Sequence, residues 1–460
     1  MTELLIKNGL VFFAGNLVRK DLSVVNGKIN AISENQSVTE AEKIIDASDK
    51  IVIPGGVDVH THILDLVYSY RDDFFTGTQC ASSGGITTVI EMPLGIEGKT
   101  AIESFEMQLK EMKKKCLVDY GLIGAAGHNT IDSISELAER GVVAFKTFMI
   151  NAPEEEAELK DLAAKDDYYL LEIFKEIAKT GLVSSVHAEN DAIIAHEIEN
   201  QIAQGKTDFI AHTNSRPVIS EDEACMRAMV LANQAKVKLN LVHMSSKTSF
   251  EHIRNAKQMG WNVSCEVTPH HLFFTTEEAE KIGSWLKVNP PIRSIEHQEA
   301  AWNGIKDGTI EMIASDHSPY SHEEKDMKSK NNNIFECGSG TPTLETMLPM
   351  MLDAANKKKI SLAKLIDVIS SNPAKRFGLF PRKGIIQVGS DADLVIIDMN
   401  KEYTLKSENM YTKSKITVFD EMKIKGAIEK TIVRGRVVFD NGKFCVEKGF
   451  GEYLTPNSSN

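Results

Sequence analysis

The chain has 460 residues, 42% of them hydrophobic and 25% charged, which is an ordinary composition for a globular protein that buries a large core. Its formal net charge of −13 opposes binding to nucleic acid and to anionic membranes, although it does not exclude a small anionic substrate. The N-terminus lacks a secretory-signal pattern, no apolar run is long enough for a membrane helix, and the six cysteines are dispersed. We therefore expect a cytoplasmic protein with neither nucleic acid nor membrane as a partner.

Short β-strands are predicted at both ends of the chain. Residues 4–52 contain strand-like runs with turns at Asn8-Gly9 and Asn26-Gly27, and residues from about 389 onward repeat this character, with a hairpin signal at Asn441-Gly442. Neither end is long enough to form a stable sheet alone. We therefore expect residues 1–52 and 382–460 to pair into one small β-sandwich domain.

Between these ends, apolar strand-like runs alternate with helical stretches, which is typical of a parallel βα barrel. The predicted strands are residues 57–60, 87–91, 118–123, 142–146, 182–187, 238–243, 262–267 and 310–316. Eight strands are the number that closes such a barrel. The sequence thus predicts an α/β fold with a TIM-like (β/α)8 barrel over residues 53–381. The polar run 325–333 is expected to be a surface loop.

Side chains that can bind metal fall where these predicted strands end. They are His60 and His62 on the first strand, Lys146 on the fourth, His187 on the fifth, His243 on the sixth and Asp316 on the eighth. Each has an ordinary alternative: a lone histidine is more often a hydrogen-bonded core residue, a lysine a solvated strand end, and an aspartate a cap. The joint pattern favours metal ligands, because the C-terminal ends of barrel strands converge on one mouth. Imidazole and carboxylate suit zinc, and also manganese, iron or cobalt.

Seven segments resemble motifs of one enzyme family. They are Pro54–His62, Gly84–Thr88, Ala144–Lys146, Val186–Asn190, Leu241–Ser246, Ala314–His317 and Gly389–Asp393. Together they make the chain similar to the cyclic amidohydrolase branch of the amidohydrolase superfamily, which includes hydantoinases, allantoinases, dihydropyrimidinases and dihydroorotases. The resemblance implies a metal-dependent hydrolase that opens the amide bond of a small ring, of EC 3.5.2 type. It also implies a homo-oligomer, either a tetramer or a dimer.

The resemblance further assigns roles to the six strand-end residues. It places His60, His62 and Asp316 on one divalent ion, and His187 and His243 on a second. It makes Lys146 a carbamate (N6-carboxylysine) that bridges both ions, which we expect to be zinc. A carbamate is anionic and offers two oxygens, whereas an ammonium would be repelled by two dications. Hydroxide held between the ions would attack the ring, with Asp316 transferring the proton.

The substrate is harder to predict, because the chain departs from each subfamily. Dihydropyrimidinases and D-selective hydantoinases carry a tyrosine five positions beyond the bridging lysine, where this chain has Asn151. Dihydroorotases carry an arginine-bearing loop, here replaced by Ile63–Tyr68, and allantoinases match at Arg216–Glu221 but have a Glu-Pro-Gly that is absent. Taken as a whole, the sequence resembles L-hydantoinases more than the other subfamilies, for example at Leu344–Leu352. We expect a hydantoin-type ring, with allantoin as the alternative ahead of dihydropyrimidines and dihydroorotate.

The resemblance also suggests which residues hold the substrate ring. Asn151, Asn289, Gly338, Ser339 and Gly340 are the expected contacts. The sequence disfavours two other functional classes. A non-catalytic scaffold of the collapsin-response mediator type is disfavoured because all six ligand positions are chemically competent, and phosphotriester hydrolysis or sugar deacetylation is disfavoured by the flanking motifs.

Overall fold

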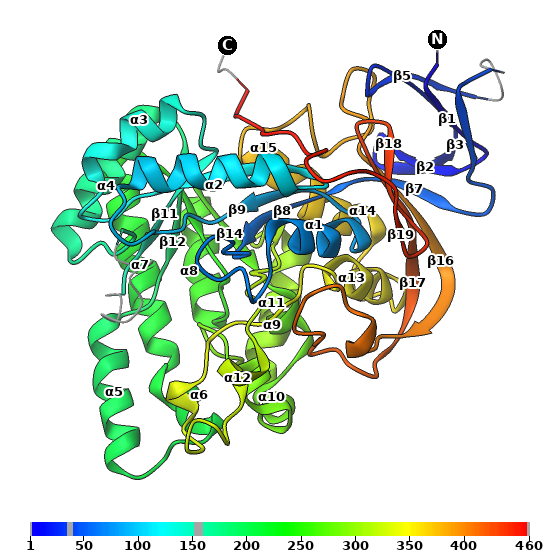
Figure 1. Ribbon diagram of the computed structural model, residues 1–460. Coiled ribbons are helices and arrows are strands. Elements are labelled where there is room, and N and C mark those ends of the chain that lie inside the picture. The colour runs from blue at the N-terminus through cyan, green and yellow to red at the C-terminus, as the bar shows by residue number, and fades with distance from the viewer. Residues whose placement is uncertain (1, 35–39, 151–158, 160, 458–460) are drawn as a thin grey trace.

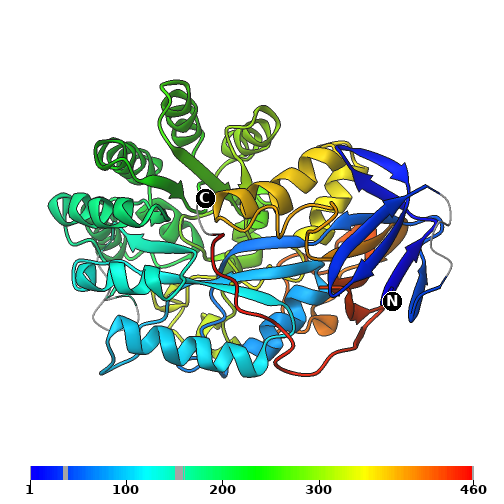
Figure 2. The same ribbon diagram turned by 90° about the horizontal axis from the view of Figure 1, so that it is seen from above.

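The computed structural model describes residues 2–34, 40–150, 159 and 161–457. Eight parallel strands form a nearly closed barrel that helices surround, and two sheets built from the chain ends lie beside it (Figures 1 and 2). The first and last barrel strands meet through Ser315, whose N–H donates to Asp58 Oδ1 at 3.1 Å, and through His62, whose N–H donates to the His317 carbonyl at 2.7 Å. The predicted α/β fold with a TIM-like barrel is confirmed.

The barrel strands follow one another in chain order around the sheet. They are β8 (Gly56–Thr61), β9 (Ile86–Glu91), β10 (Asp119–Ala125), β11 (Ala144–Phe148), β12 (Val183–His187), β13 (Lys238–Leu241), β14 (Val263–Val267) and β15 (Met312–Ile313). Nearly all of their residues are buried, because helices cover the outer face and side chains fill the inside. Each strand overlaps one of the eight predicted from the sequence.

Helices connect the strands and cover the barrel. They are α1 (Phe74–Ser83), α2 (Ala101–Lys115), α3 (Ile134–Glu139), α4 (Asp167–Thr180), α5 (Asp191–Ala203), α6 (Phe209–Ser215), α7 (Val218–Ala235), α8 (Lys247–Gln258), α9 (Pro269–Phe273), α10 (Thr276–Ile282), α11 (Ile295–Asp307), α12 (His322–Lys325), α13 (Met347–Asn356), α14 (Leu362–Ile366) and α15 (Asn372–Arg376). Helix α2 begins at a capping box, in which Thr100 Oγ1 accepts the Glu103 N–H at 3.2 Å and Glu103 Oε2 accepts the Thr100 N–H at 2.9 Å. Among the described residues, no helix has the length and apolarity of a membrane span.

The chain ends form two sheets that share an apolar core. One has the order β5-β4-β1-β6 and the other β19-β18-β17-β16-β7-β2-β3. Their bounds are β1 (Leu4–Lys7), β2 (Leu10–Phe13), β3 (Asn16–Arg19), β4 (Asp21–Val25), β5 (Lys28–Ser33), β6 (Lys43–Asp46), β7 (Ile51–Pro54), β16 (Leu394–Thr404), β17 (Lys423–Val433), β18 (Arg436–Asp440) and β19 (Lys443–Phe444). Strands β7 and β16 pair antiparallel and so join the two ends of the chain. The division into 1–52 with 382–460 and 53–381 remains a proposal, since β7 spans its first boundary.

The polar run 325–333 is mostly exposed, but its first residue is not. Lys325 is 1% exposed and donates to the carbonyls of Ser284 and Lys287, at 3.0 and 3.3 Å. The expectation of a surface loop is therefore wrong for Lys325, because two backbone carbonyls compensate its burial.

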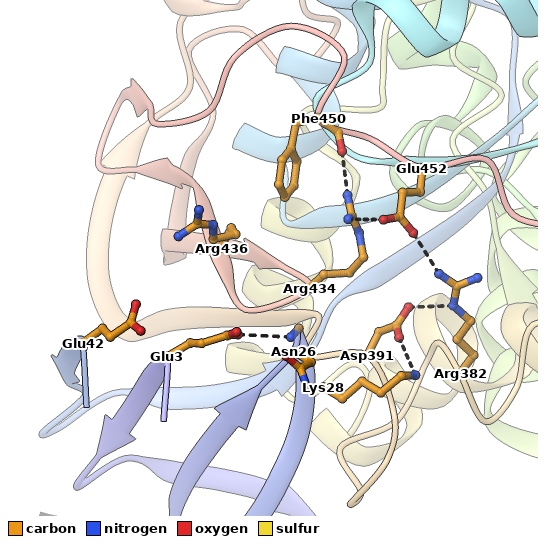
Figure 3. Close-up of a pocket in the computed structure, with 11 residues that line it drawn as sticks. Glu3, Asn26, Lys28, Glu42, Arg382, Asp391, Arg434, Arg436, Phe450 and Glu452 are labelled. Atoms are coloured by element: carbon orange, nitrogen blue, oxygen red, sulfur yellow. Dashed lines mark hydrogen bonds and ion pairs between the residues drawn. The ribbon is translucent and has the colours of Figure 1, made fainter. Parts of the chain in front are cut away.

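A charged cavity of about 740 Å³ marks the junction of the sheets, the barrel and the C-terminal tail (Figure 3). The tail returns to the barrel, where the Tyr120 N–H donates to the Glu452 carbonyl at 3.0 Å. Glu452 pairs with Arg434 at 2.6 Å and with Arg382 at 3.3 Å, and Arg382 also pairs with Asp391 at 2.8 Å. The charged lining residues are four acidic and four basic: Glu3, Glu42, Asp391, Glu452, Lys28, Arg382, Arg434 and Arg436. The lining thus carries equal numbers of acidic and basic residues, and several of them are ion-paired.

Three buried carboxylates next to this junction surround a lysine rather than a metal ion. Lys383 Nζ lies 2.5 Å from Asp119 Oδ2, 2.6 Å from Asp393 Oδ2 and 3.0 Å from Asp391 Oδ2. Burial alone would lower the pKa of Lys383, but Asp119 and Asp393 raise it above its usual value. The Lys383 ammonium is therefore the cation that all three carboxylates share.

Replacing Lys383 with methionine should destabilise the protein strongly. The substitution keeps the volume but removes the buried ammonium that all three carboxylates share, while Arg434 and Arg382 still pair with Asp119 and Asp391. We expect the free energy of unfolding to fall by about 3–5 kcal/mol, mainly because the buried Asp393 loses its ion pair. Denaturant unfolding followed by circular dichroism measures this loss. Lys357→Met is the control, because Lys357 is 59% exposed beside Asp353 and its loss should cost at most about 1 kcal/mol. Equal stability of the two variants would contradict the role given to Lys383.

Candidate metal centre

The six predicted ligand residues lie at the C-terminal end of the barrel. His60 is on β8 and His62 follows it, Lys146 is on β11, His187 ends β12, and His243 and Asp316 follow β13 and β15. All except the fully buried His60 line a cavity of about 540 Å³. The structure therefore brings together the side chains that the sequence pattern selected.

His60, His62 and Asp316 form one compact group. His60 Nε2 lies 3.1 Å from His62 Nε2 and 3.2 Å from Asp316 Oδ1, and His62 Nε2 lies 3.4 Å from the same oxygen. Two ligand atoms bound about 2.0–2.1 Å from a tetrahedral zinc ion lie roughly 3.3 Å apart. The three atoms thus have the separations that a shared cation requires.

His187 and His243 form a second group beside the first. His187 Nδ1 lies 3.0 Å from His243 Nε2, again close to the spacing of two ligands on one ion. The His243 ring is 5.4 Å from the His60 ring, centroid to centroid, so the two groups are neighbours. This arrangement fits two adjacent ions.

Lys146 contributes a buried amine to this end of the barrel. It is fully buried, and its Nζ has no hydrogen-bond partner among the described residues. Burial lowers the pKa of Lys146 to about 8, against the opposing effect of Asp316 and Glu266. An unpaired amine with a lowered pKa is suited to react with carbon dioxide, because the neutral amine is the nucleophile.

The protonation states of the imidazoles also suit metal binding. Burial lowers the pKa of His62 to about 4, and it lowers the pKa values of His187 and His243 as well. A neutral imidazole is the form that binds a metal ion. Burial alone would raise the pKa of Asp316, but His60 and His62 hold it well below its usual value, so the carboxylate stays ionised.

Two of these positions have a left-handed backbone conformation. His243 has φ +39° and Asp316 has φ +49°, in the left-handed region that side chains with a Cβ rarely adopt. Such a conformation costs roughly 1–3 kcal/mol, and strained residues of this kind cluster at functional sites.

Two buried glutamates behind the histidines were missed by the sequence analysis. Glu266 on β14 contacts His60 Nδ1 and accepts from Asn240 Nδ2 at 3.3 Å. Glu189 Oε2 lies 2.7 Å from His187 Nε2. Burial alone would raise the pKa of Glu189, but Arg216 and His187 lower it to about 2. The signal for Glu189 was its position two residues after a strand-end histidine.

The expected substrate contacts are only partly described. Asn289, Gly338, Ser339 and Gly340 line the cavity, whereas Asn151 lies outside the described residues. The N–H groups of Gly338 and Gly340 already donate to the carbonyls of Glu324 and Lys287, at 3.0 and 2.9 Å. Asn289 Oδ1 is buried without a hydrogen-bond partner in the described part of the chain. Within this set, Asn289 therefore has an acceptor to offer a substrate, and the two glycine N–H groups are already used.

Comparisons with known proteins agree over almost the whole chain. A model of the amidohydrolase family matches residues 51–438. An L-hydantoinase from Paenarthrobacter aurescens is 38% identical over 458 residues, covering 99% of this chain and 98% of that protein. An allantoinase from Enterococcus faecalis is 37% identical, covering 95% and 96%. The solved structure of an L-hydantoinase (dihydropyrimidinase) from Arthrobacter aurescens matches with a TM-score of 0.93 and 37% identity, covering 99% of this chain and 100% of that one.

Proposed function

The chain belongs to the amidohydrolase family, and we propose that it opens the ring of hydantoin-type substrates with two divalent metal ions as its cofactors. It is an enzyme of the cyclic amidohydrolase group, which acts on carbon–nitrogen bonds in cyclic amides. The observation that carries the proposal is the pair of adjacent ligand groups at the C-terminal end of the barrel. Homo-oligomerisation and a cytoplasmic location stay predictions.

We assign His60, His62 and Asp316 to one ion and His187 and His243 to the other. Their separations of 3.0–3.4 Å support this division. Carboxylated Lys146 is assigned as the bridge, supported by its buried Nζ, which has no hydrogen-bond partner within the described part of the chain. When bound, the two ions would supply hydroxide at neutral pH and polarise the scissile carbonyl. Zinc is the proposed metal, because imidazole and carboxylate suit it.

Asp316 is assigned the proton transfer. Its side chain lines the cavity and also lies near His60 and His62, so it could reach both a nucleophile held at the metal site and a substrate in the cavity. The ionised carboxylate would take the proton of the attacking hydroxide and pass it to the departing amide nitrogen. The ring then opens to a carboxylate and an N–H group, and no covalent acyl-enzyme forms.

The apolar part of the 540 Å³ cavity lining favours a hydantoin with an apolar substituent as the substrate. Apolar side chains of Leu64, Phe148, Ile194 and Ile198 are among those that line it. Allantoin, which is a hydantoin bearing a polar ureido group, is the second candidate. The 37% identity to an allantoinase and the presence of Arg216 in the cavity lining support that alternative.

A substrate panel tests the proposal. We expect kcat/KM for an apolar 5-substituted hydantoin to exceed that for allantoin by roughly tenfold or more, since each buried methylene contributes about 0.8 kcal/mol. Dihydrouracil and dihydroorotate should be slower still, and both hydantoin enantiomers should be measured. A chelator should abolish turnover, and zinc or manganese should restore it. Faster hydrolysis of allantoin would favour the alternative, and turnover that survives chelation would contradict the metal assignment.

A further inference from the structure

A fully buried glutamate lies behind one of the proposed metal ligands. The His187 ring directs Nδ1 toward His243 and Nε2 toward Glu189, whose Oε2 is 2.7 Å away. Glu189 is 0% exposed and lies two residues beyond the end of β12. An imidazole that binds a metal through one nitrogen carries N–H on the other, and an acceptor there fixes both its tautomer and its ring orientation.

Arg216 holds this glutamate from the other side. It is the C-cap residue of α6, and its Nη1 contacts the same Glu189 oxygen that faces His187. The Arg216 carbonyl in turn accepts from Arg293 Nη1 at 2.5 Å. Arg216 also lines the 540 Å³ cavity. The buried pair therefore connects the wall of the cavity to a proposed metal ligand.

Each ligand group has one histidine with a buried carboxylate behind it. In the first group, His60 has Glu266 behind it. In the second, His243 Nδ1 has no hydrogen-bond partner among the described residues. Glu189 is thus the carboxylate that fixes an outer ring nitrogen in the His187–His243 pair.

We propose that Glu189 is a positioning residue that keeps His187 Nδ1 directed at the second metal ion, and that Arg216 fixes Glu189 in place from the cavity wall. This inference rests on the proposed two-metal function. Glu189 donates nothing to the reaction. It acts by orienting His187. Replacing it should weaken binding of the second ion before it alters the fold.

Zinc titration of the full-length apoprotein tests the proposal without measuring turnover. With bicarbonate present and a chromophoric chelator as competitor, the wild type should bind two ions. Glu189→Gln keeps an oxygen for the His187 N–H but loses the charge that Arg216 holds. Its second ion should bind roughly 10- to 100-fold more weakly, while the first is unchanged. Arg216→Met should also lose affinity for the second ion. Arg216→Lys, which retains a cation, should keep part of that affinity.

Glu345→Gln is the control, because Glu345 accepts from the Tyr411 N–H at 2.8 Å rather than contacting a ligand histidine. It should bind both ions with wild-type affinity. If Glu189→Gln does not fold, as judged by circular dichroism, Arg216→Met decides, since it leaves Glu189 in place. Unchanged affinity for the second ion in the folded variant would overturn this inference but not the proposed function. A wild type that binds fewer than two ions would refute the metal assignment and the inference with it.

Discussion

Lys146→Ala is expected to lose tight binding of two metal ions and to reduce turnover by roughly 1,000-fold or more. The reason is the position of the Lys146 amine, which is buried without a hydrogen-bond partner among the described residues and lines the same cavity as both ligand groups. A carbamate on this nitrogen would supply one oxygen to each ion, and alanine supplies none. Short carboxylic acids such as acetate or propionate should partly restore activity, because they replace the missing oxygens.

Metal analysis of purified protein and initial rates measure this effect. Lys287→Met is the matched control, since Lys287 is also a buried lysine of the cavity, but it donates to the Phe335 and Cys337 carbonyls. The control should keep both ions. Intact mass and peptide mapping of the wild type should find a carbon dioxide adduct on Lys146. If Lys146→Ala binds two ions tightly and has normal rates, Lys146 is not the bridging ligand.

Asp316→Asn is expected to keep the fold and to lower kcat by roughly 100- to 10,000-fold, the usual contribution of general acid–base catalysis. Asparagine has the same size and retains an oxygen near His60 and His62, but it cannot take a proton from water. Because substrate binding does not require that proton transfer, KM should change much less than kcat.

Steady-state kinetics and metal content separate the two roles of Asp316. Retained metal with a large loss of kcat supports proton transfer. Asp307→Asn serves as a control on the surface, where Asp307 is 44% exposed and pairs with Arg254. It should leave kcat unchanged. Near-normal turnover of Asp316→Asn would mean that another residue is the base.

The barrel was predictable because its strands are buried on both faces and therefore appear as apolar runs in the sequence. The limits of the last strand were not. Residues 310–316 were expected to form it, but β15 covers only Met312–Ile313. Ile310 instead donates its N–H to the Gly304 carbonyl, and Ser315 pairs with the Asp58 side chain. These contacts join residues distant in sequence or depend on a local turn, and periodicity does not reveal them.

The six proposed ligands were selected by their places at strand ends, and the barrel brings such ends together by its geometry. Their role as ligands remains a prediction. Glu189 and Glu266 were missed because an acid near an apolar strand resembles an ordinary solvated residue until the fold places a histidine against it. The Lys383 cluster was missed for a similar reason, since its carboxylates at Asp119 and Asp393 are brought together only by the tertiary fold.

Anomalous diffraction at the zinc edge, from crystals of protein grown with zinc and bicarbonate, tests the central claim most directly. Two peaks are expected at the C-terminal end of the barrel. One should lie among His60, His62 and Asp316 and the other between His187 and His243, with density for a carbamate on Lys146 joining them. Peaks elsewhere, or none among these side chains, would contradict the two-metal centre and the hydrolytic mechanism built on it.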